Sequence, residues 1–431
     1  MLNETSLLTS CLARLEWSPE RLAREINKHC GSGTISSKAP YNWLKGARPR
    51  RQLPYLVAQI VSERLGEAVT VEALWPQHFS STPHPALAAA TPAEAEAPGT
   101  PAADPDPVAA ALDWMLADEQ EPPSQQRGEE VNPAAVEMLF ARVRQLRELD
   151  DSSGTPLAMD WASQDLRWVR KLVTKHSYDA PTGAQLHRVI AELCQFIGWL
   201  AADMGMVRPS RSCFVEGLRA ARLANDRSLA AYIISCMSYR AAWDGRGMEA
   251  LRLIGIARRG AGHETGIVEA LLATRQARAH ACLRDEAACH RALDEAADLS
   301  ESDPSSLDSP WAYWLTPAVM VADAGRAWLE LGRPKRAERE LARGIDLLGT
   351  SQPRNTLLHF TSLAEARLKL RDLDGATAAA THALSLAEEV TSLRAQVRLS
   401  TLRRLFARYD SAEIRQVLQR ADDLLGCCSV P

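Results

Sequence analysis

The sequence predicts an all-α protein, with a small helical bundle at the N-terminus and a large helical solenoid behind it. Three observations support this fold class. Apolar residues recur at helical spacing in residues 1–78 and again from Asn132 onward. Small residues recur in one frame along the C-terminal half, as they do in helical repeats. No convincing run of alternating apolar and polar residues predicts a strand, and 431 residues are enough for two or three domains.

Residues 1–79 predict a compact bundle of short helices. Ser18 and Pro19 have the types preferred at an N-cap and at the first position of a helix. A Gly-rich break separates that helix from a shorter one around 36–45, which must begin near Lys38 or Ala39 because Pro40 is tolerated only in a first turn. The expected core faces are Leu7, Leu8, Cys11, Leu12 and Leu15 on the first helix, Leu22, Ala23 and Ile26 on the second, and Leu56, Val57, Ile60, Val61 and Leu65 on a helix from Pro54.

Residues 80–132 differ from both flanking regions. They are rich in Pro, Ala and acidic residues and have few large apolar side chains, so we expect a flexible linker. Within this stretch, residues 108–121 (VAAALDWMLADEQE) form a short helical segment that carries Trp114. This segment either docks on the helices that follow or is a transient helix within the linker. The repeat domain is expected to occupy residues 133–428.

The charge is unevenly distributed, although the whole chain carries only -4. Residues 1–52 contain nine Lys or Arg and four acidic residues, whereas residues 81–130 contain one Arg and ten acidic residues. A basic N-terminal module beside an acidic tether favours a nucleic-acid partner for the N-terminal module alone.

Composition predicts a soluble protein of the cytoplasm that makes no membrane contact. The chain has 46% hydrophobic and 24% charged residues, with no apolar run near the ~18 residues of a membrane span and no signal-peptide pattern at its start. Its nine cysteines include no C-x-x-C pair, so we expect reduced, buried thiols and no metal site. Motifs for phosphate loops, nucleophilic catalysis and dinucleotide binding are missing, and we predict no enzyme, no catalytic residue and no cofactor.

An internal repeat dominates the C-terminal half. Each copy has a polar turn followed by a helix on which two small residues lie seven positions apart, and therefore on one face. Two helices pack closely only where side chains are short, so these positions predict contacts between helices. The pairs are Ser210 with Gly217, Ala250 with Ala257, Cys289 with Ala296, Ala337 with Gly344 and Ala376 with Ala383, and their first members are spaced by 40, 39, 48 and 39 residues.

This pattern resembles the tetratricopeptide repeat (TPR), in which a Leu-Gly pair precedes the turn and small residues follow on the second helix. Leu331-Gly332 with Ala337 is the best local match. The spacing exceeds the usual ~34 residues, so longer helices or loops are expected. The resemblance implies a right-handed TPR-like α-solenoid whose concave face binds a partner or a ligand.

Two N-terminal segments, SPERLAREI (18–26) and ISSKAPYNWLKGARPR (35–50), resemble the helix-turn-helix of the lambda-repressor-type (XRE) family. The following LPYLVAQIVSERLG (53–66) is similar to the family's fourth helix, and the resemblance covers residues 5–76. The turn from Asn27 to Thr34 is about seven residues longer than the family's tight turn, so the angle of the next helix can differ. The resemblance implies that the helix around 36–45 enters the major groove of double-stranded DNA.

The same resemblance assigns roles to individual side chains. Asn pairs with adenine and Lys with guanine in the major groove. Phosphate contacts position a protein on DNA and make its binding sensitive to salt. Trp43 falls at a buried apolar position of the family, and Tyr41 is alternatively a core residue. The candidate base readers are Ser36, Ser37, Lys38, Tyr41 and Asn42, and the candidate phosphate contacts are Lys45, Arg48, Arg50 and Arg51, which on their own would be read as a solvated basic loop.

Seven aromatic residues of the repeat region are candidates for an effector pocket on the concave surface. Tyrosine and tryptophan at helical spacing are more often packing residues, and that alternative stays open. The group at 311–314 is the densest, and it follows a loop that could gate a site. The candidates are Trp199, Tyr232, Tyr239, Trp243, Trp311, Tyr313 and Trp314.

The order of an XRE-like head, an acidic linker and a TPR-like body is similar to that of actinobacterial regulators of development and secondary metabolism. This resemblance implies a sequence-specific transcriptional regulator that forms a homodimer through its repeats. It also implies that the repeats sense a peptide, protein or small-molecule effector. The alternative is a TPR-type adaptor that binds proteins and not DNA.

Overall fold

The computed structural model describes residues 7–30, 35–45, 47, 49, 53–65, 69, 74–75, 105–153, 155–262, 266–302, 310–350, 352–390 and 392–426. Over these ranges the chain forms helices and no strand, and two isolated β-bridges join Gln125 to Tyr178 and Glu130 to Ser177. The predicted all-α, repeat-like solenoid architecture is therefore confirmed. The chain divides into two compact units, a head unit (1–84 with 418–431) and a repeat unit (85–417), which we describe separately.

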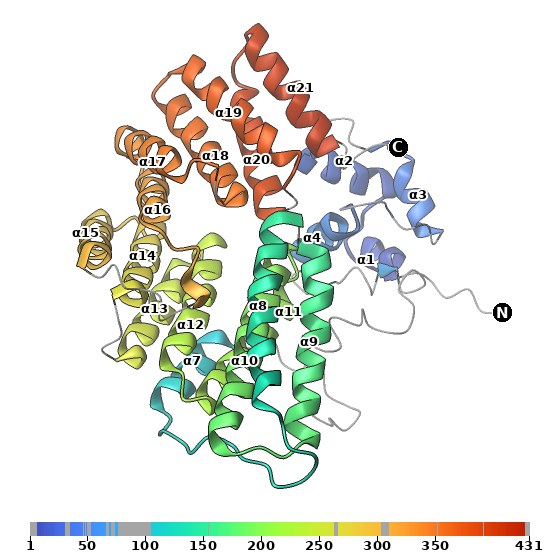
Figure 1. The fold of residues 1–431 in the computed structure, drawn as a ribbon. Helices are drawn as coiled ribbons and strands as arrows, with labels where there is room; N and C mark the ends of the chain where they lie inside the picture. Colours follow the sequence, from blue (N-terminus) through green and yellow to red (C-terminus); the bar gives the residue numbers. More distant parts are fainter. Residues whose placement is uncertain are drawn as a thin grey trace, which may run out of the picture. The chain divides into compact units, whose positions relative to one another are not determined.

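The repeat unit is an array of helix pairs, which follow one another in chain order from green to red in Figure 1. Five pairs consist of adjacent antiparallel helices joined by a short turn. They are α10 (Ala180–Asp203) with α11 (Val207–Leu223), α12 (Arg227–Trp243) with α13 (Gly247–Ala261), α14 (Gly266–Cys282) with α15 (Glu286–Ser302), α16 (Pro317–Glu330) with α17 (Pro334–Leu348), and α18 (Pro353–Lys369) with α19 (Leu373–Ala387). The other helices are α7 (Pro107–Leu116), α8 (Pro133–Ser153), α9 (Thr155–Lys175), α20 (Leu393–Phe406) and α21 (Ala412–Gly426), the last of which spans the boundary between the units.

The five turns within the pairs have the same backbone conformation. In each turn the central residue has a positive φ, and it stands five positions before the first small residue of the repeat. At the α16–α17 turn, the amide of Gly332 donates to the carbonyl of Leu329 (3.1 Å) and that of Arg333 to the carbonyl of Trp328 (2.9 Å), which is the Schellman pattern. The central residues are Gly205, Gly245, Arg284, Gly332 and Arg371, with φ of 74, 77, 63, 75 and 63°.

The small residues of the repeat pack where the two helices of a pair cross. All ten are buried, and all lie on the second helix of a pair, as the sequence pattern predicts. At Gly344 a Cβ atom would come within 2.6 Å of Ala322 on α16, and at Gly217 it would come within 3.1 Å of Cys194 on α10. A larger side chain at either position would push the helices apart, so the frame of small residues sets the spacing of the array.

The first helices of the pairs form an inner layer. The helices α10, α12, α14 and α18 bury residues on nearly every face, and α12 packs on α14, α14 on α16 and α18 on α20. The last helix of this layer contacts the first. Arg394 on α20 donates to both carboxylate oxygens of Asp203 on α10. Arg354 on α18 similarly donates to Asp150 on α8 at 2.8 and 3.0 Å.

The segment before the array belongs to the repeat unit. Asp106 caps α7 by accepting from the amide of Val108 (2.9 Å), and α7 packs on α11, α12 and α13. Trp114 of α7 is 8% exposed and contacts α13 at Gly260. Of the two alternatives for residues 108–121, the structure shows docking. Of residues 105–132, expected as part of the flexible linker, α7 and Val131 pack in the core of the repeat unit, and bridges join Gln125 and Glu130 to residues 178 and 177, but no residue of 117–130 is buried. Residues 80–104 lie outside the described part of the chain.

The head unit contains α1 (Leu7–Arg14), α2 (Pro19–Cys30), α3 (Ala39–Leu44) and α4 (Leu53–Leu65). The helix α3 begins at Ala39, with Lys38 as N-cap and Pro40 in the first turn, as predicted. Leu7, expected in the core, is 41% exposed, because the buried face of α1 is formed by Leu8, Cys11 and Leu12. Between α4 and residue 105, the structure describes Val69, Leu74 and Trp75. The core consists of Leu8, Cys11, Leu12, Leu22, Ala23, Ile26, Ile35, Trp43, Val57, Ala58, Ile60, Val61, Leu74 and Trp75.

Candidate functional site

One candidate surface of the head unit is the outer face of α3 and the residues just before it. Pro40 and Trp43 are buried and fix the inner face of this helix, as the sequence predicts for Trp43. The predicted DNA-contacting residues Ser36, Ser37, Lys38, Tyr41, Asn42 and Lys45 are all exposed. The structure therefore brings the described part of the predicted surface together on one side of α3. Arg48, Arg50 and Arg51 lie outside the described residues.

The long turn before α3 is bridged by one side chain. The Asn27 amide on α2 donates to the carbonyl of Ile35 (3.0 Å), and its oxygen accepts from the amide of Ile35 (2.8 Å). Ile35 is itself in the core. This two-pronged contact holds the chain on both sides of residues 31–34, so the length of the turn does not leave the start of α3 unattached.

Tyr41 has a partner within the head unit. Its hydroxyl donates to a carboxylate oxygen of Glu20 on α2. This hydrogen bond stabilises the charged carboxylate and the neutral phenol, so it lowers the pKa of Glu20 and raises that of Tyr41. Tyr41 therefore links α3 to α2 while its ring stays 42% exposed.

In the repeat unit, six of the seven predicted aromatic residues gather in two groups. The ring of Tyr239 lies 5.6 Å from that of Trp199 and 6.3 Å from that of Trp243. Tyr232 stacks on Trp311 at 4.3 Å, and the indole of Trp314 donates to the hydroxyl of Tyr232 (3.3 Å). The seventh, Tyr313, is half exposed and donates to Asp151 on α8 (2.9 Å).

Buried arginines, which the sequence pattern did not indicate, join these groups. The Arg275 guanidinium lies 4.4 Å from the Tyr239 ring and 5.2 Å from the Trp314 ring, so it connects the two groups. Arg394 lies over Trp199 at 4.6 Å and Arg326 over Trp243 at 5.7 Å. These contacts are cation–π stacks in a region from which water is largely excluded.

Carboxylates of the inner layer pair with the same arginines. Asp323 is 3.3 Å from Arg326 and 3.6 Å from Arg275, and Asp203 is 3.1 Å from Arg394. Removing one partner of such a buried pair leaves an uncompensated charge at high cost. We call Tyr239, Arg275, Asp323, Arg326 and Arg394 the arginine cluster.

Charge and burial shift the pKa values of three titratable groups of the repeat unit. Burial by itself raises the pKa of Tyr239, but the guanidinium groups of Arg326 and Arg394 outweigh it and lower the pKa to about 8. Burial raises the pKa of Tyr232, so the two buried tyrosines differ in acidity. Burial also lowers the pKa of His359 to about 4, which keeps this imidazole uncharged at neutral pH.

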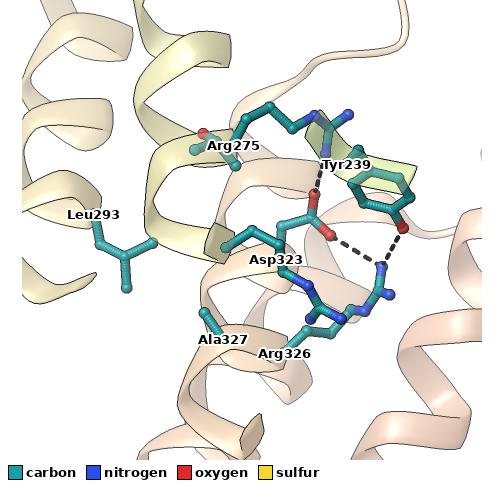
Figure 2. A pocket seen from close by; sticks show the side chains of 8 residues that line it. Tyr239, Arg275, Leu293, Asp323, Arg326 and Ala327 are labelled. Atoms are coloured by element: carbon teal, nitrogen blue, oxygen red, sulfur yellow. Dashed lines mark hydrogen bonds and ion pairs between the residues drawn. The ribbon is translucent and has the colours of Figure 1, made fainter. Parts of the chain in front are cut away.

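A small cavity adjoins the arginine cluster, as Figure 2 shows. Its volume is about 10 Å³, which is room for one water molecule. Arg275, Asp323, Arg326 and Tyr239 form a continuous chain of ion pairs and hydrogen bonds along one side. The lining residues are Tyr239, Thr274, Arg275, Arg278, Leu293, Asp323, Arg326 and Ala327. Of the predicted pocket residues, Tyr239 alone lines this cavity.

The fold and these surfaces define an all-α protein with a compact head and a solenoid of helix pairs. In comparisons with known proteins, residues 8–74 match the family described as the SP15 N-terminal domain. This match covers most of the head and less than half of the chain, and it is not an assignment to a helix-turn-helix family. No curated protein matches the chain.

No helix of the described residues is both long enough and apolar enough to cross a membrane. Within the same residues, no group of three or more His, Cys, Asp or Glu side chains could hold a metal ion.

Proposed function

We propose that the protein is a sequence-specific DNA-binding transcriptional regulator of the XRE type. Its head unit binds double-stranded DNA, and its repeat unit forms a homodimer and senses an effector. The observation that carries the DNA part is the exposed polar face of α3, which is mounted on a buried Pro40 and Trp43. A short helix with a fixed inner face and a polar outer face has the form of a helix that reads the major groove.

The side chains on this face support different roles. Lys38 and Asn42 are exposed and lie one helical turn apart, which suits contacts with neighbouring base edges. Lys45 follows at the end of α3, where a point charge suits a backbone phosphate. The Asn27 bridge and the Tyr41–Glu20 hydrogen bond limit the motion of the helix relative to α2, so less order remains to be gained on binding.

The homodimer is supported by the outer face of α9. Trp161 and Trp168 are 50% and 44% exposed and lie seven residues apart on one face, which is unusual for large apolar side chains on a solvated helix. Asp160 precedes this stripe, and Lys171 follows it. In an antiparallel pair of α9 helices around a two-fold axis, Asp160 of one copy lies near Lys171 of the other, and the stripes cover each other.

A binding titration with the full chain tests the DNA part. Selection from random double-stranded DNA should enrich a common sequence, and affinity for it should fall steeply with salt. Replacing Lys38 and Asn42 together by Ala should remove the sequence preference and leave non-specific binding. Replacing Lys45 by Ala should weaken binding to all sequences and reduce the salt slope by about one. Lys175→Ala on α9 is the control and should change neither property.

The outcome also distinguishes the adaptor alternative. If no sequence is enriched and binding does not depend on salt, the head unit does not bind DNA and the protein is an adaptor. The dimer is tested separately by light scattering after gel filtration. Replacing Trp161 and Trp168 by Glu should convert a dimer to a monomer, and a dimer that survives this change uses another surface.

A further inference from the structure

The phenol of Tyr239 is buried between groups that only donate hydrogen bonds. The residue is 5% exposed, and its oxygen accepts from Nη1 of Arg326 (3.3 Å, Figure 2) and from Nη1 of Arg394 (3.5 Å). A guanidinium has N–H donors and no acceptor, so neither arginine can accept the proton of the phenol. None of the described residues accepts that proton either. A neutral phenol would therefore keep a buried O–H group without a partner, which is costly, whereas a phenolate has no such group.

The charges around Tyr239 favour the same ionisation state. Three guanidinium groups lie close to it, because two donate to its oxygen and that of Arg275 lies 4.4 Å from the centre of its ring. The carboxylates that pair with these three groups are those of Asp323 and Asp203. One positive charge is therefore in excess among these side chains, and a buried charge without a counter-charge is unfavourable. A phenolate at Tyr239 supplies the missing negative charge.

The other charged groups of the surrounding helices leave this excess unchanged. Four further arginines each have an acidic partner of their own. His359 on α18 adds no charge at neutral pH, because burial lowers its pKa to about 4. The four pairs are Arg278 with Glu330 (3.0 Å), Arg240 with Asp244 (3.2 Å), Arg354 with Asp150 (2.8 Å) and Arg398 with Glu365 (2.9 Å).

Tyr232, a second buried tyrosine of α12, shows what burial does without such donors. Burial by itself disfavours the charged form of both phenols, and it raises the pKa of Tyr232. The hydroxyl of Tyr232 accepts from the indole of Trp314, and no described guanidinium donates to it. At Tyr239 the charges of Arg326 and Arg394 outweigh burial and lower the pKa to about 8. The two tyrosines therefore form a matched pair on one helix.

The contact of Tyr239 with Arg394 joins an early helix of the array to a late one. Tyr239 lies on α12 and Arg394 on α20, and the same guanidinium also donates to Asp203 on α10. We propose that Tyr239 holds Arg394 as a phenolate, so that the contact of α20 with α10 and α12 tightens when the phenol loses its proton. The phenolate and Asp203 then hold α20 through two negative charges, whereas a neutral phenol leaves one. The repeat unit thereby responds to pH without an effector, which the proposed function does not include.

The ionisation is tested on the full chain by the near-ultraviolet absorbance of phenolate during a pH titration, with circular dichroism to confirm that the chain stays folded. One tyrosine should ionise with a midpoint of about 8, whereas an ordinary tyrosine ionises near 10. Tyr239→Phe should remove this step, and Tyr232→Phe, the matched control, should retain it. Arg394→Gln should raise the midpoint by about 1 pH unit or more, because the phenolate loses one of its two donors.

The closing contact is tested by hydrogen exchange of the α20 amides, corrected for the intrinsic effect of pH on exchange. Their protection should rise by about 10-fold between about pH 7 and pH 9, the factor for each unit by which the closed contact lowers the pKa. Tyr239→Phe should show no such rise. The amides of α9, a helix without a residue of the arginine cluster, are the control and should not change.

Three results would overturn the proposal. In the first, no tyrosine of the folded protein ionises below the ordinary range. In the second, Tyr239→Phe leaves the early step in place, so another group produces it. In the third, Tyr239 ionises early but the protection of α20 does not follow, so its charge does not hold the contact. None of these readouts involves DNA, so a head unit that fails to bind DNA leaves this result unaffected.

Discussion

Trp114 on α7 lies directly against Gly260 on α13, so closely that a Cβ atom at position 260 would come within 2.2 Å of the indole ring. The missing side chain of Gly260 thus provides the space that the ring of Trp114 occupies. The contact joins a segment that composition alone assigns to a linker with a helix 146 positions further along the chain.

Gly260→Ala should release α7 from α13. The added methyl group overpacks the contact and should lower the free energy of unfolding of the repeat unit by about 1–3 kcal/mol. Limited proteolysis should then cut within residues 105–132. Gly255→Ala on the same helix is the control, because its nearest neighbour atom would be 3.7 Å away. It should be neutral or stabilising by up to about 1 kcal/mol. Equal effects of the two changes would contradict the role of the Trp114 contact.

Substitutions at two of the five turns should change the free energy of unfolding in opposite directions. Gly332 has φ of 75° and Arg371 has φ of 63°, a region that costs residues with a Cβ about 1–2 kcal/mol. Gly332→Ala should therefore destabilise the repeat unit by about 1 kcal/mol, and Arg371→Gly should stabilise it by a similar amount. Urea unfolding followed by circular dichroism measures both. If both substitutions changed the stability in the same direction, the positive φ would not be what determines the effect of a residue at these positions.

The Asp203–Arg394 pair should be among the most sensitive positions of the protein. Asp203→Asn leaves the buried guanidinium without its counter-charge and should cost about 3–5 kcal/mol. Adding Arg394→Met should recover part of this loss, so the double variant should be more stable than the sum of the single effects predicts. The control is the exposed pair of Arg333 with Glu286, where Glu286→Gln should leave the unfolding midpoint unchanged. Additive effects at Asp203 and Arg394 would mean that the two side chains are not coupled.

Stability should rise with pH in the alkaline range because of Tyr239. Its folded-state pKa is about 8, while an unfolded tyrosine has a pKa near 10. Between these values the unfolded chain holds a proton that the folded protein has released, so raising the pH favours the folded state. The gain should be up to about 2–3 kcal/mol between pH 8 and pH 10, and it is lost again as the pH falls through 8. Urea unfolding at several pH values measures it, and Tyr239→Phe should lack the rise. A rise of the same size in that variant would assign the effect to another group.

The fold can be predicted from the sequence wherever residues close together in the chain determine how the helices pack. Pairs such as Ala337 and Gly344 predict where two helices cross, because only small side chains fit where the helices approach closely. The positive φ of two of the turns could not be predicted from residue type, since Arg284 and Arg371 hold the conformation that Gly adopts in the others. The docking of α7 could not be decided from the sequence for a different reason. The packing of α7 involves contacts with residues far away in sequence, such as that of Trp114 with Gly260, and composition gives no information about them.

In the candidate sites, too, features set by neighbouring residues could be predicted, and features set by helices distant in sequence could not. The exposed face of α3 could be predicted because buried and exposed positions alternate locally around Pro40 and Trp43. The aromatic residues of the inner layer were found by type, whereas Arg275 and Arg394 were not. An arginine on a helix normally indicates a solvated face, and these two become buried only when helices distant in sequence close around them.

That closure has a consequence for the evolution and assembly of the chain. Most solenoids have free ends, and they gain or lose a repeat with little effect on the rest. Here the pairs of Asp203 with Arg394 and of Asp150 with Arg354 join positions 191 and 204 residues apart. Duplication or deletion of one helix pair would separate both pairs of charges, so the number of repeats is fixed. Folding should accordingly be slow and all-or-none, since the last contacts to form span nearly half of the polypeptide.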